Sequence, residues 1–354
     1  MKIRILQLAK FNFNYKGGIE KVTFKIHKFL NTKYSIFTIY LGNNFSKKKK
    51  ILIEKINFSF NSFYFSFGYL FKALKCGKKF DYLIGHMPNP LCIVLLFFPK
   101  KYYLYWHSDV VNKNFLLNII YKPIEILLII FAKKIIFTSE EYYKYSYVKI
   151  FNKSYCIIPL SASVTNQPLQ TKNISSNISS SVKLLSVGRL VIYKNYFFLL
   201  KVLQQLPNFS LTIVGEGPEY CKLQKFIEQK NIQNVKILRN VSDENLITIY
   251  KSHDIFCLAS NTRAEAFGLV LIEALSHGLP ILVGNNKGSG MITICENNYN
   301  GLVFDYNKNE FEKKLLEICK NYNYFSVNAV KSFHKKYTDQ SFFNNISSLI
   351  TLAK

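Results

Sequence analysis

The strongest chemical signal in the sequence is a pair of carboxylates eight residues apart. Glu265 stands just before a predicted helix, and Glu273 lies about two turns inside it in an otherwise apolar run. The first N–H groups of a helix have no intrahelical partner and favour an anion such as a diphosphate. The predicted donors are the N–H groups of Phe267, Gly268, Leu269 and Val270. A blander alternative is that Glu265 only stabilises the helix dipole and Glu273 pairs with a lysine.

Two cations follow an earlier predicted strand. Arg189 and Lys194 come shortly after Gly188, in the loop behind the strand at 183–187. Two such cations can neutralise a diphosphate and stabilise it as a leaving group. The chain has 43 lysines but only four arginines, so an arginine suggests a position that needs a planar, bidentate donor. The alternative is a solvated pair on a lysine-rich surface.

A glycine pair forms a third candidate site. Gly17 and Gly18 follow the first predicted strand and open a helix. Glycine lets backbone N–H groups approach an anion at a helix N-terminus. The pair alone is a weak signal, because it is not a G-x-G-x-x-G fingerprint and serves a purely structural turn about as often.

The elements that must position these residues alternate between strand and helix. In the first half we predict strands at 2–8, 34–40, 81–84, 102–106, 134–137 and 156–159, with helices at 18–30, from about 90, at 115–131 and at 140–147, the last capped by Thr138-Ser139. In the second half we predict strands at 183–187, 210–214, 235–238, 255–258 and 280–283, with helices at 195–206, 218–230, 243–252 and 267–277 and further helices from about 309. Such alternation favours parallel sheets covered on both faces.

This pattern predicts an α/β fold of two Rossmann-like domains that face a cleft. The first domain covers 1–165, a polar Ser- and Asn-rich linker covers 166–182, and the second domain covers 183–335. We expect a C-terminal helix at 336–354 to pack back toward the first domain. Ligands in such folds bind at the carboxyl ends of the strands.

Composition narrows the class of protein. The 354 residues are 49% hydrophobic and 19% charged, which fits a globular chain. The seven cysteines include no C-x-x-C pair, so neither a disulfide framework nor a cysteine zinc site is suggested. We find no apolar run of ~20 residues and no signal-peptide pattern. We therefore expect a cytoplasmic protein, peripheral at the inner face of the cytoplasmic membrane.

The positive charge is concentrated in the first half. The whole chain carries a net +26, and residues 1–165 hold 26 basic and 7 acidic residues, a net +19. This half should be attracted to an anionic membrane surface. The candidate docking residues are some of Lys47–Lys50, Lys72, Lys75, Lys78 and Lys79, with the aromatic stretch Phe58–Phe71. The alternative is a solvated lysine surface produced by compositional drift.

Taken together, the motifs resemble a known family. The E-x7-E element of Glu265 and Glu273 occurs with further elements: Gly17-Gly18, Gly188-Arg189-Leu190, Lys194, Gly215-Glu216-Gly217-Pro218 and Gly278-Leu279-Pro280. With these the chain resembles the retaining glycosyltransferases of family 4, which have the GT-B fold. The similarity covers nearly the whole chain. Asn195 and Asn240 stand where the family commonly has glycine, and we expect them to adopt positive φ.

The resemblance implies roles for individual residues. Glu265 would approach the donor sugar and Glu273 the ribose. Arg189 and Lys194 would bind the diphosphate, and Gly17-Gly18 would approach it from the other domain. His107, in the segment Trp106–Val111, would line the sugar pocket, either as an acid or base or by positioning the substrate through its ring or backbone.

The resemblance also implies a reaction. The chain would move a hexosyl group from a nucleotide-sugar, GDP-mannose or a UDP-hexose, to a lipid-linked saccharide acceptor in cell-surface polysaccharide synthesis. The sequence has no D-x-D and no paired histidines at metal-ligand spacing, so we expect metal-independent transfer without a cofactor. The alternatives are a sugar-nucleotide epimerase of the same fold and a basic nucleic-acid-binding protein. We expect no nucleic-acid partner, since most aromatic residues fall in apolar strands and helices.

Overall fold

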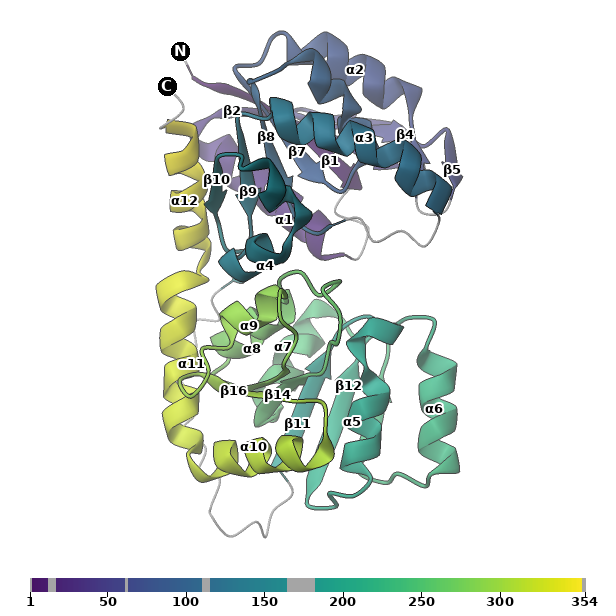
Figure 1. Cartoon of the computed structure of the whole chain (residues 1–354), viewed down its shortest axis with the longest axis vertical. Helices are drawn as coiled ribbons and strands as arrows, with labels where there is room; N and C mark the ends of the chain where they lie inside the picture. Colours follow the sequence, from purple (N-terminus) through teal and green to yellow (C-terminus); the bar gives the residue numbers. More distant parts are fainter. Residues whose placement is uncertain (1, 12–16, 61–62, 110–114, 164–181, 352–354) are drawn as a thin grey trace. The chain divides into compact units, whose positions relative to one another are not determined.

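A computed structural model describes residues 2–11, 17–60, 63–109, 115–163 and 182–351 (Figure 1). The chain divides into two compact units. Unit 1 comprises Met1–Pro159 and Phe343–Lys354, and unit 2 comprises Leu160–Phe342. The predicted linker lies outside the described residues except for Val182, which begins the first strand of unit 2.

Unit 1 is built on a sheet of eight strands in the order β10-β9-β8-β7-β1-β2-β4-β3. The strands are β1 (Arg4–Phe11), β2 (Ser35–Gly42), β3 (Ser46–Lys48), β4 (Ile51–Lys55), β7 (Tyr82–Met87), β8 (Tyr102–Trp106), β9 (Lys134–Phe137) and β10 (Tyr155–Ile157). All neighbours pair in parallel except β3 and β4. The strand order turns back between β1 and β7, which places a topological switch point at their carboxyl ends.

The helices of unit 1 cover this sheet. They are α1 (Gly18–Lys33), α2 (Phe67–Gly77), the 3₁₀-helix η1 (Pro90–Phe97), α3 (Phe115–Phe131), α4 (Glu140–Tyr145) and the 3₁₀-helix η2 (Tyr147–Phe151). In Figure 1, α2 and α3 lie in front of the sheet. The last helix of the chain, α12 (Asp339–Thr351), contributes its C-terminal part to this unit, where Phe343 packs edge-on against Phe29 of α1 at 5.8 Å.

Unit 2 has six parallel strands in the order β13-β12-β11-β14-β15-β16. They are β11 (Val182–Val187), β12 (Phe209–Val214), β13 (Val235–Leu238), β14 (Ile255–Leu258), β15 (Ile281–Gly284) and β16 (Gly301–Phe304). This is the Rossmann order 3-2-1-4-5-6, whose switch point lies between the first and fourth strands, here β11 and β14. Apart from Lys183, the side chains of the central strands β11 and β14 are buried, as their largely apolar sequences require.

The helices of unit 2 connect these strands and extend to the C-terminus. They are η3 (Ile192–Lys194), α5 (Tyr196–Leu203), α6 (Tyr220–Gln229), α7 (Asp243–Ser252), α8 (Leu269–Ser276), α9 (Gly290–Ile294), α10 (Lys308–Lys320) and α11 (Tyr322–Lys336). No helix of the described ranges is both long and apolar enough to cross a membrane.

Several predicted elements are confirmed. The strands β8, β9, β13 and β14 and the helices α3 and α7 have the predicted bounds. Ser139 caps α4 by accepting a hydrogen bond from the N–H of Tyr142 at 3.1 Å. Asn195 and Asn240 have φ of +55° and +52°, so both positions keep a conformation that glycine favours.

Other elements differ from the prediction. The strands β3, β4 and β16, the hairpin of β5 (Phe58–Phe60) and β6 (Phe63–Phe65), and the helices α2 and α9 were not predicted. The helix expected from about residue 90 is the 3₁₀-helix η1. The predicted helix 267–277 begins at Leu269, because Gly268 takes a left-handed conformation with φ of +98° and so ends up as its N-cap.

Candidate active site

The predicted site residues of unit 2 gather around its switch point. Gly188, Arg189 and Lys194 follow β11, while Glu265 and the start of α8 follow β14. Because β11 and β14 are parallel neighbours, both loops leave the same edge of the sheet. This is the position at which open α/β sheets bind ligands.

A glycine makes room for a buried lysine in the first of these loops. Lys194 is 5% exposed. A Cβ on Gly188 would lie 2.9 Å from Lys194 Nζ and 3.0 Å from its Cε, and the φ of Gly188 is +155°. Gly188 therefore leaves the space that the Lys194 side chain fills, since a larger residue at 188 would displace the ammonium group of Lys194.

Lys194 and Glu265 form a buried ion pair. Nζ of Lys194 lies 2.5 Å from Oε2 of Glu265, and both side chains are almost fully shielded from solvent. The same carboxylate oxygen accepts a hydrogen bond from the hydroxyl of Ser260 at 3.1 Å. A buried charge is stable only when it is paired and hydrogen-bonded, so this pair fixes both side chains at the edge of the sheet.

Tyr196 extends this group. Its hydroxyl donates to the carbonyl oxygen of Gly188 at 3.2 Å. Burial, and next the negative charge of Glu265, raise the pKa of Tyr196 far above its usual range. The phenol therefore stays protonated and holds the loop after β11 in place.

Arg189 and the start of α8 offer groups that no protein partner uses. Arg189 is exposed, and within the described ranges its guanidinium has no ion-pair or hydrogen-bond partner. Leu269 and Val270 belong to the first turn of α8, so their N–H groups are orphan donors. Phe267 and Gly268 precede the helix, and their predicted place in its first turn is wrong for the conformational reason given above.

Glu273 is held by a tyrosine from a neighbouring helix. The hydroxyl of Tyr250, in α7, donates to Oε2 of Glu273 at 3.0 Å. Burial, followed by the charge of Glu273, raises the pKa of Tyr250 well above its usual range, so it remains a donor. Glu273 itself is half-buried, which leaves its carboxylate able to reach a ligand.

The glycine turn after β12 has a steric explanation. A Cβ on Gly215 would lie 1.9 Å from the carbonyl oxygen of Gly188, and a Cβ on Gly217 would lie 2.4 Å from that of Leu190. The two loops therefore pack backbone against backbone. This turn therefore supports the loop that carries Lys194.

In unit 1 the glycine pair opens α1. Gly17 is the N-cap in an extended conformation, and Gly18 is the first helical residue. The carboxylate of Glu20 occupies the space that a Cβ on Gly17 would need. The pair thus lies at a helix N-terminus as predicted, although the residues just before it, 12–16, are outside the described part.

His107 lies directly after β8, at the carboxyl edge of the unit 1 sheet. Its N–H extends the ladder by donating to the carbonyl oxygen of Met87 at 3.1 Å. The ring stacks on Tyr105, and its Nε2 lies 2.9 Å from Nδ1 of His86. Burial lowers the pKa of His107 to about 3, so the ring is neutral at physiological pH.

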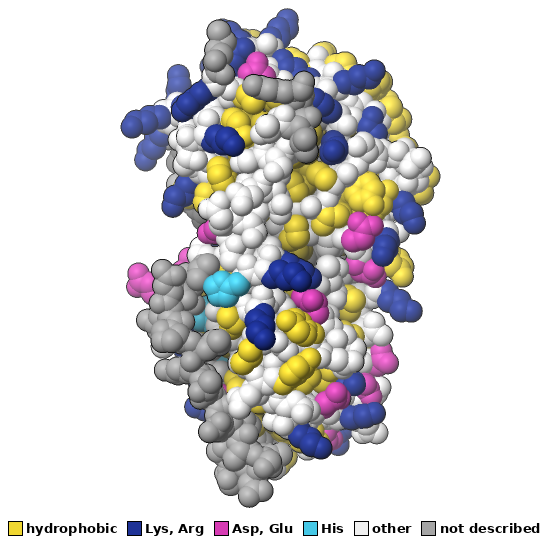
Figure 2. Space-filling model, turned by 90° about the vertical axis from the view of Figure 1, so that its left-hand side faces the viewer, with side chains coloured by type: hydrophobic (Ala, Val, Ile, Leu, Met, Phe, Trp, Pro, Cys, Tyr) yellow, Lys and Arg dark blue, Asp and Glu magenta, His cyan; other side chains and the backbone are white. Residues whose placement is uncertain are grey.

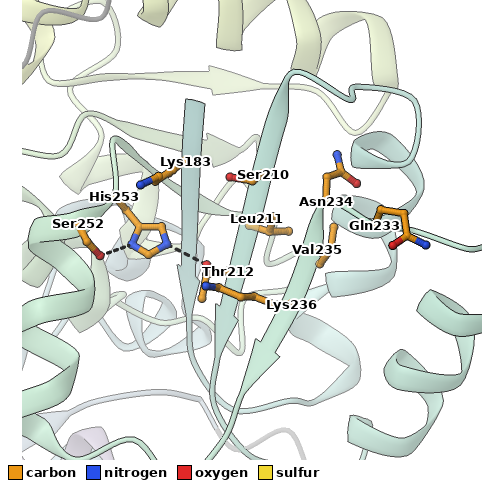
Figure 3. A pocket seen from close by; sticks show the side chains of 10 residues that line it. All are labelled: Lys183, Ser210, Leu211, Thr212, Gln233, Asn234, Val235, Lys236, Ser252 and His253. Atoms are coloured by element: carbon orange, nitrogen blue, oxygen red, sulfur yellow. Dashed lines mark hydrogen bonds between the residues drawn. The ribbon is translucent and has the colours of Figure 1, made fainter. Parts of the chain in front are cut away.

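A pocket of about 270 Å³ lies elsewhere in unit 2 (Figure 3). Its walls include the amino-terminal residues of β11, β12 and β13, so it opens at the edge of the sheet opposite to Gly188. Nε2 of His253 there contacts the hydroxyl oxygen of Thr212 at 2.8 Å, and Nδ1 contacts the carbonyl oxygen of Ile249. Both ring nitrogens serve the fold, and no predicted site residue lines this pocket.

Sequence reasoning missed three residues that hold the site together: Ser260, Tyr250 and His86. Ser260 sits within the richest motif and could have been found from it. Tyr250 and His86 lie in apolar stretches of α7 and β7, and only the topology brings them to Glu273 and His107. No group of three His, Cys, Asp or Glu side chains in the described ranges is arranged to hold a metal ion.

The sequence was compared with those of known proteins. The sequence model of the family described as "Glycosyl transferases group 1" matches residues 170–333. An uncharacterized glycosyltransferase of Haemophilus influenzae is 30% identical over 326 residues, which is 88% of each chain. The O-antigen chain mannosyltransferase C of Escherichia coli is 21% identical over 355 residues, 95% of each chain.

The fold was compared with solved structures. The Anabaena protein HepE in complex with UDP matches with a TM-score of 0.77 at 16% identity. The match covers 99% of this chain and all of that one. It extends over both units, each of which has its own parallel sheet.

Proposed function

Because this chain belongs to the group 1 glycosyltransferases and has the GT-B fold, we propose that it transfers a hexosyl group from a nucleotide-sugar to a saccharide acceptor. We further propose that the transfer retains the anomeric configuration, needs no metal ion, and serves cell-surface polysaccharide synthesis on a lipid-linked acceptor. The O-antigen mannosyltransferase among the relatives supports the pathway class. The HepE complex supports a UDP-sugar donor, and GDP-mannose stays the other candidate.

The observation that carries this proposal is the buried contact of Lys194 with Glu265 at the switch point. Lys194 would share its charge with the diphosphate, and the exposed guanidinium of Arg189 would add a second cation. The free N–H groups at the start of α8 would complete the neutralisation. Glu265 would then lie where the transferred sugar is held.

In this proposal Glu273 binds the hydroxyl groups of the ribose. The hydroxyl of Tyr250 orients the half-buried carboxylate of Glu273, and a carboxylate can accept several hydrogen bonds, including those from ribose hydroxyls. The roles that the resemblance gives to Gly17, Gly18 and His107 remain predictions. Gly17 and Gly18 would approach the phosphate, and His107 would line the sugar pocket.

The experiment that tests the reaction combines binding with turnover. Thermal melting with GDP-, UDP- and dTDP-sugars identifies the donor, since a ligand at ~100 times its Kd adds ~2.7 kcal/mol to the free energy of unfolding. Transfer to lipid-linked saccharide is then followed with and without a chelator, and NMR of the product gives its anomeric configuration. A product of inverted configuration would overturn the proposed retention, and loss of activity with the chelator would overturn the proposed metal independence. Epimerised donor without transfer would favour the epimerase.

We also propose that unit 1 docks on an anionic membrane surface. The outward face of α3 is apolar: Ile119, Leu127, Ile130 and Phe131 are 41–53% exposed. Phe97 of η1, which packs beside α3, is 70% exposed. Exposed apolar patches of this kind are typical of interaction surfaces.

Basic groups border this apolar face. Nζ of Lys153 donates to the carbonyl oxygen of Ile130, and the N–H of Lys100 donates to that of Phe131. The lysines of α2 are exposed beside the exposed rings of Phe67 and Phe71. The side of unit 1 that Figure 2 shows, turned by 90° from the view of Figure 1 in which α3 lies in front, also carries many Lys and Arg side chains and few acidic ones. Each surface lysine would contribute ~1 kcal/mol toward anionic headgroups.

Vesicle sedimentation tests this docking. The protein should sediment with anionic vesicles, should not with neutral ones, and should be released by high salt. Lys72→Glu, Lys75→Glu and Lys78→Glu together should weaken binding without changing nucleotide affinity. The matched control is the same charge reversal at the exposed lysines of unit 2, Lys225, Lys230 and Lys236. Equal binding to neutral vesicles, or none to either, would contradict the proposal.

A further inference from the structure

Three aromatic rings form a stack at the carboxyl edge of the unit 1 sheet. His86 of β7 is in register with Tyr105 of β8, and His107 follows two residues later on the same face. The His107 ring lies 4.6 Å from that of Tyr105 and 5.2 Å from that of His86, with interplanar angles of 9° and 12°. The hydroxyl of Tyr105 is anchored on the carbonyl oxygen of Ile158 at 3.1 Å. The stack therefore allows neither imidazole much rotation.

The two imidazoles are hydrogen-bonded to each other. Nδ1 of His86 and Nε2 of His107 are 2.9 Å apart. His86 is 1% exposed and His107 is 6% exposed. Burial lowers the pKa of both rings, so both are neutral and one of the two nitrogens must carry the shared proton.

The shared proton can be on Nδ1 of His86 or on Nε2 of His107, and the other ring nitrogen of His86 decides between these two arrangements. Nε2 of His86 is buried and has no hydrogen-bond partner. If His107 were the donor, the proton of His86 would have to be on this nitrogen, as a buried N–H without an acceptor. If His86 is the donor, the same nitrogen is a bare acceptor, and unpaired acceptors are the more common exception in folded proteins. The second arrangement leaves the proton of His107 on Nδ1.

We propose that His86 is a positioning residue that donates from Nδ1 to Nε2 of His107 and so keeps the proton of His107 on Nδ1. This inference rests on the proposed function, in which His107 lines the sugar pocket. Nδ1 is the ring nitrogen that remains to His107 for a ligand. His107 then acts as a hydrogen-bond donor to an oxygen of the sugar substrate, and not as a base.

The tautomer can be measured without any substrate. In protein with ¹⁵N-labelled histidine, long-range ¹H–¹⁵N NMR distinguishes a protonated ring nitrogen from a bare one. The chain has six histidines, and the His86→Leu and His107→Gln variants assign the two signals. We expect wild-type His107 to be protonated on Nδ1 and bare on Nε2. A proton on Nε2 of His107 would overturn the inference.

Substitutions at His86 test the consequence for catalysis. His86→Leu removes the donor, so kcat should fall about two- to tenfold, the effect of losing one hydrogen bond. In His86→Asn the amide stands near the position of Nδ1 and can donate to His107, so this variant should recover most of the activity. The affinity for nucleoside diphosphate should be the same in both, since its proposed site is in unit 2.

A matched control separates positioning from packing. His27 is another buried histidine of unit 1, bonded through Nδ1 to the hydroxyl oxygen of Thr38 at 2.7 Å. His27→Leu should leave kcat and the signals of His107 unchanged. Equal kcat in His86→Leu, His86→Asn and wild type would overturn the role of His86. If wild-type protein transferred no sugar at all, the proposed function would fail, while the NMR signals would still test the hydrogen bond.

Discussion

At the scale of single residues, the candidate site is a set of buried charges and hydroxyls that hold one another. Lys194 and Glu265 neutralise each other, and Ser260 adds a hydrogen bond to the same carboxylate. Arg189 and Glu273 keep part of their side chains available to a ligand. This difference in burial indicates that Lys194 and Glu265 shape the inside of the site, whereas Arg189 and Glu273 extend it toward solvent.

The first prediction concerns the transition state. Glu265→Gln and Arg189→Ala should each lower kcat by about 10²- to 10³-fold, while the donor KM changes much less, because charge develops on the diphosphate and the sugar as their bond breaks. Steady-state kinetics with the identified donor measures both constants. Arg4→Ala is the control, since Arg4 pairs with Asp81 at the amino-terminal end of β1 in unit 1. A change in KM alone in both variants would mean that the assigned roles are wrong.

The second prediction concerns the ribose. Tyr250→Phe removes the hydrogen bond that orients Glu273, so the affinity for nucleoside diphosphate should fall about two- to tenfold. Glu273→Ala should cost more and should weaken the free nucleoside diphosphate and the sugar donor by the same factor. Isothermal titration measures both. Tyr322→Phe, which removes a hydroxyl from another buried tyrosine of unit 2, should have no effect. A loss confined to the intact donor would contradict the assignment.

At the scale of elements, short apolar strands and capped helices were predictable, and the exact start of the key helix was not. The strand β13, for example, lies between the polar residues Asn234 and Arg239, so its ends are visible in the sequence. The start of α8 depends on the left-handed conformation of Gly268, which sequence periodicity does not reveal. The edge strand β3 has two lysines in its three residues, and it forms because β4 offers an antiparallel partner.

A prediction at this scale concerns the start of α8. Gly268→Ala places a Cβ on a residue with φ of +98°, and Gly278→Ala does the same with φ of +73° just after the other end of the helix. Both should lower the free energy of unfolding by about 1–2 kcal/mol, measured by urea denaturation. Only Gly268→Ala should weaken binding of nucleoside diphosphate. Equal weakening in both variants would argue against a phosphate site at this helix start.

At the scale of the whole molecule, the two units have different acid sensitivities. Unit 1 contains three buried histidines with lowered pKa values: His27, His86 and His107. Burial, and then the charge of Lys50, lower the pKa of His27 to about 4. In unit 2, burial lowers the pKa of His277. Three of the buried imidazoles thus lie in unit 1, which carries most of the positive charge.

The resulting prediction is that unit 1 loses stability in mild acid. Unfolded histidine binds a proton near pH 6.5, whereas folded His27 does so only near pH 4, so the unfolded state gains protons as pH falls through this window. Each such histidine lowers the free energy of unfolding by up to about 1.4 kcal/mol per pH unit. Calorimetry between pH 7.5 and 5 should show a shallower slope in His27→Asn than in wild type. His334→Asn, at an exposed position, is the control, and an unchanged slope in His27→Asn would refute the prediction.

The ion pair of Lys194 and Glu265 has a consequence for the end of each catalytic cycle. A cation that binds a diphosphate tightly in a shielded place would ordinarily resist product release, since departure of the anion would leave the cation bare. Here a carboxylate already lies beside the ammonium group. If Lys194 binds the diphosphate as proposed, Glu265 would again be its counter-charge when the nucleoside diphosphate leaves. The contact seen in the empty site would then lower the barrier to product release and restore the site for the next donor.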